Sequence, residues 1–294
     1  MFRGAITALV TPFNDTGIDE EAFRAHIDRQ IRSGIDGIVP CGTTGESPTL
    51  SHAEHKRVIE IAVSEAKGRV PVLAGTGSNN TAEAVELTKF AKSAGADGGL
   101  VITPYYNKPT PEGLYRHFKT IAEAVKLPLV AYNVPGRTGV NMTADTVARV
   151  ADIPGVVGIK EATGNMMLAN EIIARTRPDF IVLSGDDFTV LPLLSIGGKG
   201  VISVASNLVP GEMSALVKAF FAGDNAEAKR LHYKLLPLVE ALFVETNPIP
   251  VKTAMAMLGF VWPDLRLPLC PMAEANRKRL ETALAAYCPL EGKK

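Results

Sequence analysis

Short runs of apolar residues recur along the chain, and eight of them have the length and composition of β-strands. Nearly every residue in these runs is apolar, so they lack the alternation of a strand with one face in water. Continuous apolar runs are typical of a parallel sheet covered on both faces. The predicted strands span residues 5–10, 37–40, 70–74, 99–103, 127–132, 156–160, 180–183 and 200–204.

The segments between these runs have the spacing of amphipathic helices. One apolar stripe with steps of four, three and four residues consists of Leu114, Phe118, Ile121 and Val125. Residues 51–54 and 80–83 each have the form of a capping box, in which a polar residue is followed three positions later by Glu. Thr110 followed by Pro111 marks another helix start.

Eight strands alternating with helices predict a (β/α)8 TIM barrel over residues 1–223. A doubly wound sheet usually has fewer strands and a glycine-rich dinucleotide turn after its first strand, and no such turn follows this one. From residue 224 the pattern is helical without strands, at 226–244, 250–258 and 271–287. We therefore expect a C-terminal helical appendage over residues 224–294.

The charge balance excludes several partners. The 294 residues include 31 Lys and Arg and 31 Asp and Glu, a formal net charge of zero. Nucleic-acid binding and polybasic membrane attachment both require a basic surplus, so neither is expected. No signal peptide or transmembrane run is evident. Cys41, Cys270 and Cys288 form no disulfide framework or zinc motif, so we expect a soluble, cytoplasmic protein.

Active sites of barrel enzymes lie at the carboxyl ends of the strands, which makes Lys160 the leading candidate. It closes the apolar run 156–159. Removal of an ammonium from water favours the neutral amine, which can condense with a carbonyl. The alternative is a lysine that extends to solvent. Lys199 precedes its strand and is expected at the opposite end of the barrel.

Other polar residues follow neighbouring strands. Tyr132 can place a phenol near Lys160 for proton transfer, or it is a core tyrosine. Thr43 and Thr44 can offer hydroxyl and N–H groups to an anion, or they form only a tight turn. Arg137 can hold a carboxylate, or it is a solvated loop arginine.

The sequence gives no sign of a metal or cofactor. His52 and His55 lie three residues apart, but no third ligand follows them at a suitable spacing. The glycine-rich segments match neither dinucleotide nor P-loop patterns. Asp186 and Asp187 after the seventh strand would repel a phosphate, which favours a carboxylate substrate. We therefore expect no cofactor.

Four motifs, each at a strand end, resemble the pyruvate-dependent class I aldolases and lyases, and within them the dihydrodipicolinate synthase family. The resemblance covers nearly the whole chain. It implies condensation of pyruvate with L-aspartate 4-semialdehyde in the diaminopimelate route to lysine. The motifs are Gly42-Thr43-Thr44-Gly45-Glu46-Ser47, Tyr105-Tyr106-Asn107-Lys108-Pro109, Tyr132-Asn133-Val134-Pro135-Gly136-Arg137-Thr138-Gly139 and Gly158-Ile159-Lys160-Glu161-Ala162-Thr163.

The resemblance also implies roles for individual residues. Lys160 would form a Schiff base with pyruvate, and Arg137 would hold the semialdehyde carboxylate. A proton relay would consist of Thr44, Tyr132 and Tyr106, with Tyr106 supplied by a neighbouring subunit. The remaining pyruvate contacts would come from Thr43, Thr44, Gly185 and Ile202.

Members of the family are usually dimers of dimers, so a homotetramer is expected. The resemblance further suggests inhibition by L-lysine, with Glu83 as partner of the effector's ammonium. Glu83 is also explained as part of a helix cap. Pro48 stands where the family pattern has a small residue. The effector-site pattern matches Ser47, His52, His55, Asn79, Glu83 and Tyr105.

Two alternative functions remain open. One is another pyruvate-dependent aldolase of the same fold, such as a relative of N-acetylneuraminate lyase, which typically lacks the Arg-Thr-Gly at 137–139. The other is a barrel without catalytic activity that binds a small carboxylate and regulates a partner.

Overall fold

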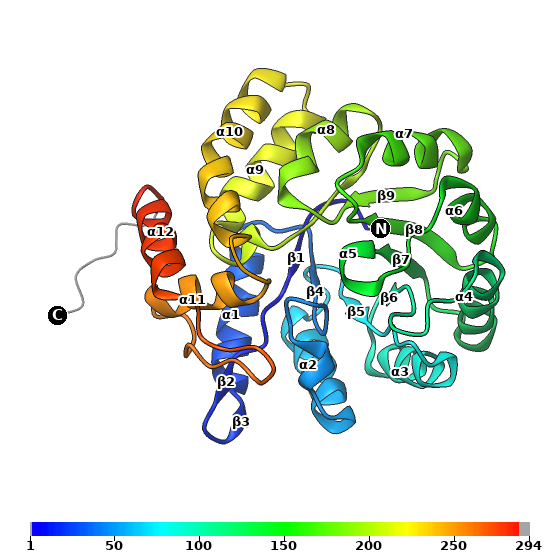
Figure 1. The fold of residues 1–294 in the computed structure, drawn as a ribbon, viewed down its shortest axis with the longest axis horizontal. Helices are drawn as coiled ribbons and strands as arrows, with labels where there is room; N and C mark the ends of the chain where they lie inside the picture. The colour runs from blue at the N-terminus through cyan, green and yellow to red at the C-terminus, as the bar shows by residue number, and fades with distance from the viewer. Residues whose placement is uncertain (1, 288–294) are drawn as a thin grey trace.

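In a computed structural model, which describes residues 2–287, eight parallel strands form a nearly closed barrel surrounded by helices (Figure 1). The sheet order is β4-β1-β10-β9-β8-β7-β6-β5, and a bridge between Ile38 and Val72 joins its two edges. The fold is therefore the predicted TIM barrel. Its strands are β1 (Gly4–Ala8), β4 (Gly37–Val39), β5 (Leu73–Gly75), β6 (Gly98–Ile102), β7 (Leu129–Asn133), β8 (Val156–Glu161), β9 (Ile181–Ser184) and β10 (Gly200–Ser203).

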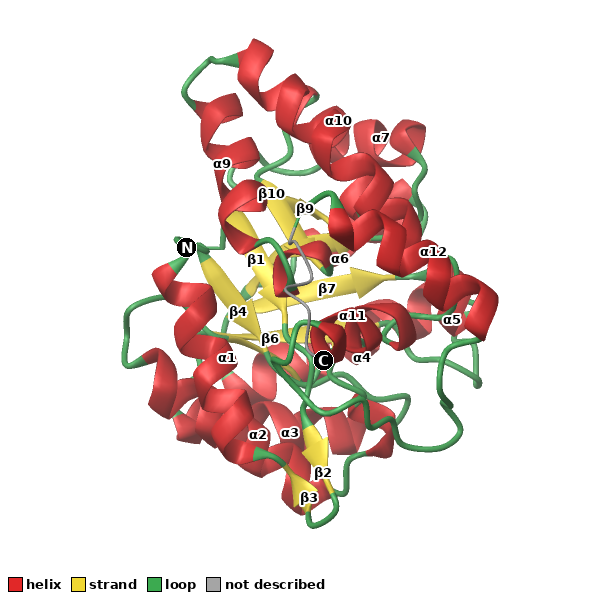
Figure 2. Ribbon diagram, turned by 90° about the vertical axis from the view of Figure 1, so that its left-hand side faces the viewer, coloured by secondary structure: helices red, strands yellow, loops and turns green. Residues whose placement is uncertain are grey.

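Each predicted strand is present, and no strand end differs by more than three residues from the predicted one. Figure 2 shows the strands in the middle of the molecule with helices outside them. The helices of the barrel are α1 (Glu20–Arg32), α2 (His52–Ala66), α3 (Thr81–Ala94), α4 (Pro111–Val125), α6 (Ala144–Ala151), α7 (Met166–Arg175), α8 (Val190–Ser195) and α9 (Pro210–Phe221), with the short α5 (Pro135–Thr138) after β7.

A distinct cluster of buried side chains fills the barrel, because it joins residues of strands that are not neighbours. Strand β8 contributes the polar Lys160 to the barrel in place of an aliphatic side chain. The cluster consists of Phe2, Ile6, Ala8, Val39, Leu73, Leu100, Val130, Tyr132, Val134, Leu183 and Ile202.

The helix starts show where local sequence signals are reliable. Ser51 and Glu54 form the predicted capping box at α2. Thr110 caps α4, and all four residues of its predicted stripe are buried. The capping box over residues 80–83 is wrong. Asn80 caps α3 through the Ala82 N–H, whereas Glu83 turns to other partners.

Three helices follow the barrel: α10 (Asn225–Leu242), α11 (Ile249–Met257) and α12 (Glu274–Ala285). They match the predicted helical segments, except that α12 begins three residues later. The first of them, α10, packs against α9, the last helix of the barrel. The predicted division into a barrel and a separate C-terminal segment at residue 223 therefore stays a prediction. The prediction for residues 288–294, including Cys288, lies outside the described residues.

The sequence pattern missed a small hairpin of β2 (Phe13–Asn14) and β3 (Gly17–Ile18), which lies away from the barrel (Figure 2). Two-residue strands are too short to give a periodic signal. Within residues 2–287 no helix combines the length and the apolar character needed to cross a membrane.

Candidate active site

Lys160 and Tyr132 lie side by side at the carboxyl ends of two neighbouring strands. They are partners in the register of β8 and β7, so their side chains leave the sheet on the same face. Lys160 is 6% exposed, and its Nζ lies 4.4 Å from the centroid of the Tyr132 ring. Lys160 does not extend to solvent, so the alternative proposed from the sequence is wrong.

The loop after β4 holds Thr43 and Thr44 in a tight turn. The Gly45 N–H donates to the Gly42 carbonyl and the Glu46 N–H to that of Thr43. Thr44 is 3% exposed, whereas Thr43 is partly exposed and lines a cavity. The tight turn that the sequence offered as one alternative is present, and anion binding by the same loop stays a prediction.

Asn247, in the connection between α10 and α11, joins this loop to Arg137. Its side-chain Nδ2 donates to the Thr44 Oγ1 at 3.0 Å, and its carbonyl accepts from the Arg137 guanidinium at 3.0 Å. Asn247 is 7% exposed. Sequence reasoning missed it, because the Asn-Pro pair at 247–248 signals only a turn.

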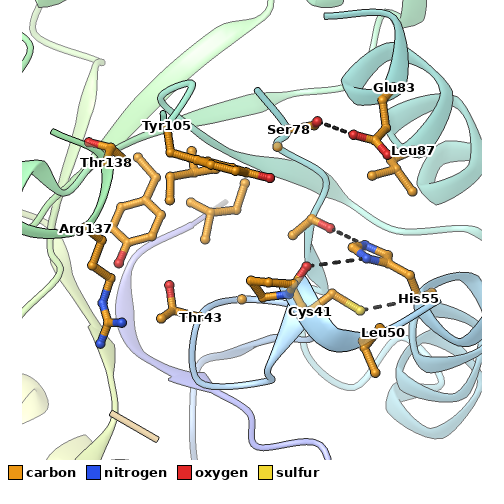
Figure 3. Close-up of a pocket in the computed structure, with 18 of the residues that line it drawn as sticks. Cys41, Thr43, Leu50, His55, Ser78, Glu83, Leu87, Tyr105, Arg137 and Thr138 are labelled. Carbon is orange, nitrogen blue, oxygen red and sulfur yellow. Dashed lines mark hydrogen bonds between the residues drawn. The ribbon is translucent and has the colours of Figure 1, made fainter. Parts of the chain in front are cut away.

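A cavity of about 530 Å³ connects these residues with the second predicted site. Arg137 and Thr43 lie at one end, Ser78 and Glu83 lie at the other, and Tyr105 lies between the two ends (Figure 3). Tyr132 also lines the cavity. Lys160 is buried and does not itself line the cavity, but its Nζ lies 4.4 Å from the centroid of the Tyr132 ring.

The remaining predicted site residues lie at three separate positions. Ile202 packs with Tyr132 in the barrel interior. Gly185 is buried after β9, and its N–H donates to the Glu161 carbonyl. Tyr106 is 89% exposed on the loop after β6 and does not line the cavity of its own chain. A single chain therefore does not test the predicted role of Tyr106 in a neighbouring subunit.

The predicted effector residues gather at the far end of the cavity. Glu83 pairs with His52 at 2.9 Å and accepts a hydrogen bond from Ser78. Glu83 itself lines the cavity, and its explanation as part of a helix cap is wrong. Ser47, Pro48 and Tyr105 also line the cavity.

His55 connects this end of the cavity with the end of strand β5. Its Nε2 donates to the Gly75 carbonyl at 2.8 Å, and its Nδ1 lies 3.5 Å from the Ser47 hydroxyl. Burial lowers the pKa of His55. Asn79 does not line the cavity but donates to the Tyr105 carbonyl at 3.2 Å.

A buried ion pair fixes the end of the Thr43–Thr44 loop. Lys252 of α11 lies 2.6 Å from the Glu46 carboxylate, with side-chain exposures of 0% and 1%. The Arg266 N–H also donates to Glu46, and the Arg266 guanidinium pairs with Glu54. No role for Glu46 could be predicted from the sequence, because its partners are more than 200 residues away.

Two buried carboxylates stand near Lys160. Burial raises the pKa of Glu161 to about 7, although the Thr163 N–H donates to it. Burial also raises the pKa of Asp187. The Asp187 carboxylate accepts from the N–H groups of Val204 and Ala205, so it supports the loop after β10. The predicted repulsion of phosphate by Asp186 and Asp187 stays a prediction.

No group of three or more His, Cys, Asp or Glu side chains within the described part of the chain could hold a metal ion. The polar groups at the carboxyl ends of β4, β7 and β8 are instead an amine, a phenol and hydroxyls. The molecule thus belongs to the class of (β/α)8 barrels and carries polar groups at the end of the barrel where enzymes of this class have their active sites.

Comparison with known proteins identifies the family. The model of the Dihydrodipicolinate synthetase family matches residues 1–287. A 4-hydroxy-tetrahydrodipicolinate synthase from Oleidesulfovibrio alaskensis is 64% identical over 285 residues, which cover 97% of this chain and 98% of the relative. The chain therefore belongs to the dihydrodipicolinate synthase family, and it is a lyase.

Solved structures of the family agree with this fold. The chloride-inhibited dihydrodipicolinate synthase from Acinetobacter baumannii, complexed with pyruvate, has a TM-score of 0.95 at 47% identity, covering 97% of this chain and 99% of that chain. The enzyme from Cyanidioschyzon merolae with lysine bound has a TM-score of 0.93 at 43% identity, covering 97% and 98%.

Proposed function

We propose that this enzyme condenses pyruvate with L-aspartate 4-semialdehyde to give 4-hydroxy-tetrahydrodipicolinate, in the diaminopimelate route to lysine in the cytoplasm. The observation that carries the proposal is the burial of Lys160 against Tyr132 at the carboxyl ends of β8 and β7. The names of the relatives and the pyruvate complex of the Acinetobacter enzyme support the choice of substrates.

The chemistry needs a primary amine and groups that move protons. Lys160 Nζ attacks the pyruvate carbonyl, and loss of water gives an imine. Loss of a C3 proton converts the imine into an enamine, whose C3 attacks the aldehyde carbon and forms the new bond. The amino group of the bound semialdehyde portion then displaces Lys160 and closes the ring. Overall, one water is released.

Proton transfers fall to the hydroxyl groups of Tyr132 and Thr44. Tyr132 lies within contact of Lys160 Nζ, and the Thr44 hydroxyl lies in the loop after β4. Thr43 and Thr44 hold the pyruvate carboxylate, and Gly185 and Ile202 complete its pocket. Arg137 presents a guanidinium at the exposed side of the cavity, which suits the semialdehyde carboxylate.

Tyr106 completes the relay from a neighbouring subunit of a homotetramer. Its exposure of 89% in a single chain supports a role outside its own barrel. Mixing Lys160→Ala and Tyr106→Phe subunits under exchange conditions tests this arrangement. Hybrid pairs contain one site with both native side chains, so activity should rise above that of either variant alone. No rise would refute the shared site.

Borohydride trapping with pyruvate, followed by mass spectrometry, tests the mechanism. We expect one adduct on Lys160, none in Lys160→Ala, and an unchanged adduct in the matched control Lys199→Ala. Lys199 precedes β10 at the opposite end of the barrel. An equal adduct in Lys160→Ala would exclude the mechanism. Absence of any adduct and any turnover would favour a barrel that only binds carboxylates.

Arg137→Ala separates this function from that of an aldolase with another acceptor. The variant should still form the pyruvate adduct, because Arg137 does not contact Lys160. Loss of a charge-assisted contact to the semialdehyde should lower kcat/KM for it by about 10- to 100-fold. Unchanged semialdehyde kinetics would show that the acceptor is a different compound.

Feedback inhibition by L-lysine is the regulatory part of the proposal. The cluster of Ser47, His52, His55, Asn79, Glu83 and Tyr105 supports it, as does the lysine-bound structure of the Cyanidioschyzon enzyme. Glu83→Gln removes the charge that would face the effector's ammonium, so lysine should inhibit this variant at least tenfold more weakly.

Glu86→Gln is a matched control for Glu83→Gln, because Glu86 lies on the same helix but pairs with Lys56 outside the cavity. It should retain the inhibition of the native enzyme. Equal weakening in both variants, or no effect of lysine on the native enzyme, would reject the effector site.

A further inference from the structure

We propose that Asn247 is a positioning residue of this enzyme, which sets the direction in which the Thr44 hydroxyl passes its proton. The inference rests on the proposed function, because it concerns the relay of that reaction. Asn247 lies in the connection between α10 and α11, outside all four motifs that indicated the site.

The hydrogen bond between the two side chains has a defined sense. Asn247 Nδ2 donates to Thr44 Oγ1 at 3.0 Å. A hydroxyl has one proton and two acceptor positions. Since the amide occupies one acceptor position, the Thr44 proton must point elsewhere. The second lone pair stays open, so Thr44 can accept one proton and release another without changing its own charge.

The carbonyl of Asn247 makes a separate contact with the acceptor side of the site. It accepts from Arg137 at 3.0 Å. One residue thus touches the group proposed for the pyruvate side and the group proposed for the semialdehyde carboxylate. Only the first contact depends on the Asn247 side chain, so substitution can separate the two.

The surroundings of Asn247 hold it in place. Lys252, five residues later, forms the buried ion pair with Glu46 of the Thr44 loop. The Lys252 N–H also donates to the Pro248 carbonyl. Asn247 and Thr44 are therefore fixed relative to each other by a second connection between the same two segments.

Asn247 also leaves one polar atom unused. Its Oδ1 is buried without a hydrogen-bond partner among the described residues. Most buried polar atoms have partners, and exceptions gather at functional sites.

A double-mutant cycle with Thr44→Val tests the inference. Asn247→Ala should lower kcat about tenfold in the native enzyme and less than about twofold in the Thr44→Val background. The KM for the semialdehyde should stay within about twofold of the native value, because the contact of Arg137 with the backbone carbonyl remains.

Asn247→Asp is the second variant, because it keeps the size of the side chain and removes the donor. A carboxylate would instead accept the Thr44 proton, so kcat should fall at least as far as in Asn247→Ala. Unchanged kcat in Asn247→Asp would overturn the inference. An equal loss from Asn247→Ala in both backgrounds would also overturn it, because the effect would then not pass through the hydroxyl.

The pyruvate adduct on Lys160 distinguishes this failure from failure of the proposed function. Trapping should be complete in the native enzyme and in both Asn247 variants. A native enzyme without adduct and without turnover would overturn both proposals. A native enzyme with adduct and turnover, combined with an additive cycle, would overturn the role of Asn247 alone.

Discussion

Loss of the Lys252 ammonium should destabilise the protein strongly. Lys252 and Glu46 are almost completely buried and lie 2.6 Å apart. In Lys252→Met, the Glu46 carboxylate would remain in the interior with the Arg266 N–H as its neighbour at 3.1 Å. Breaking a buried pair by removing one partner costs about 3–5 kcal/mol, because the other charge stays without compensation.

The expected change in melting temperature follows from the size of the chain. Unfolding entropy is about 2.1 cal/mol/K per residue, or about 0.6 kcal/mol/K for 294 residues. A loss of 3–5 kcal/mol therefore corresponds to a Tm lower by about 5–8 °C. Calorimetry or circular dichroism at a fixed protein concentration measures it, since subunit association also stabilises the folded state.

The double variant Glu46→Gln/Lys252→Met separates charge burial from packing. It has no buried charge at this position, so it should recover more than half of the lost Tm. Lys56→Met is the control, because Lys56 forms an exposed pair with Glu86 at 2.9 Å and should leave the Tm nearly unchanged. A Lys252→Met variant no less stable than Lys56→Met would refute the reasoning, as would a double variant less stable than the single one.

Two further predictions concern β8. Burial raises the pKa of Glu161 from 4.5 to about 7, so its ionisation destabilises the folded protein as the pH rises through this range. Glu161→Gln should therefore have a higher Tm than the native protein at pH 8 but not at pH 4. An equal difference in Tm at both pH values would contradict this. A Cβ at Gly158 would lie 2.4 Å from the Ile181 carbonyl oxygen, so Gly158→Ala should lower the free energy of unfolding by about 1–3 kcal/mol and lower kcat by shifting Lys160. In the control Gly211→Ala, the nearest neighbour of the new Cβ lies at 4.0 Å, so thermal and kinetic assays should show neither change.

The barrel could be predicted because each of its strands is buried on both faces. The resulting apolar runs are visible without knowledge of their partners, and only their ends shift, as where β7 begins at Leu129. The pairing of Tyr132 with Lys160 could also be anticipated, because consecutive strands of a parallel barrel are neighbours. Periodicity and strand order are local or nearly local properties of the sequence.

Asn247 and Lys252 could not be predicted in this way. Their partners Thr44 and Glu46 are separated from them by 203 and 206 residues. Contacts over this distance depend on how the last helices pack against the barrel, and hydrophobic periodicity does not encode that packing. Glu83 shows a related difficulty, since its spacing from Asn80 fits a cap but its carboxylate binds Ser78 and His52.

The C-terminal helices are therefore part of the site and not only an appendage of the barrel. Three residues of this C-terminal part contact the stretch from Thr43 to Glu54, which joins β4 to the first turn of α2: Asn247 contacts Thr44, Lys252 contacts Glu46, and Arg266 contacts Glu46 and Glu54. The same segment carries Thr43 at one end of the cavity and Ser47 and His52 at the other. Since all of these contacts hold side chains of one short stretch of the chain, a change in how the C-terminal helices pack would act on both ends of the cavity at once.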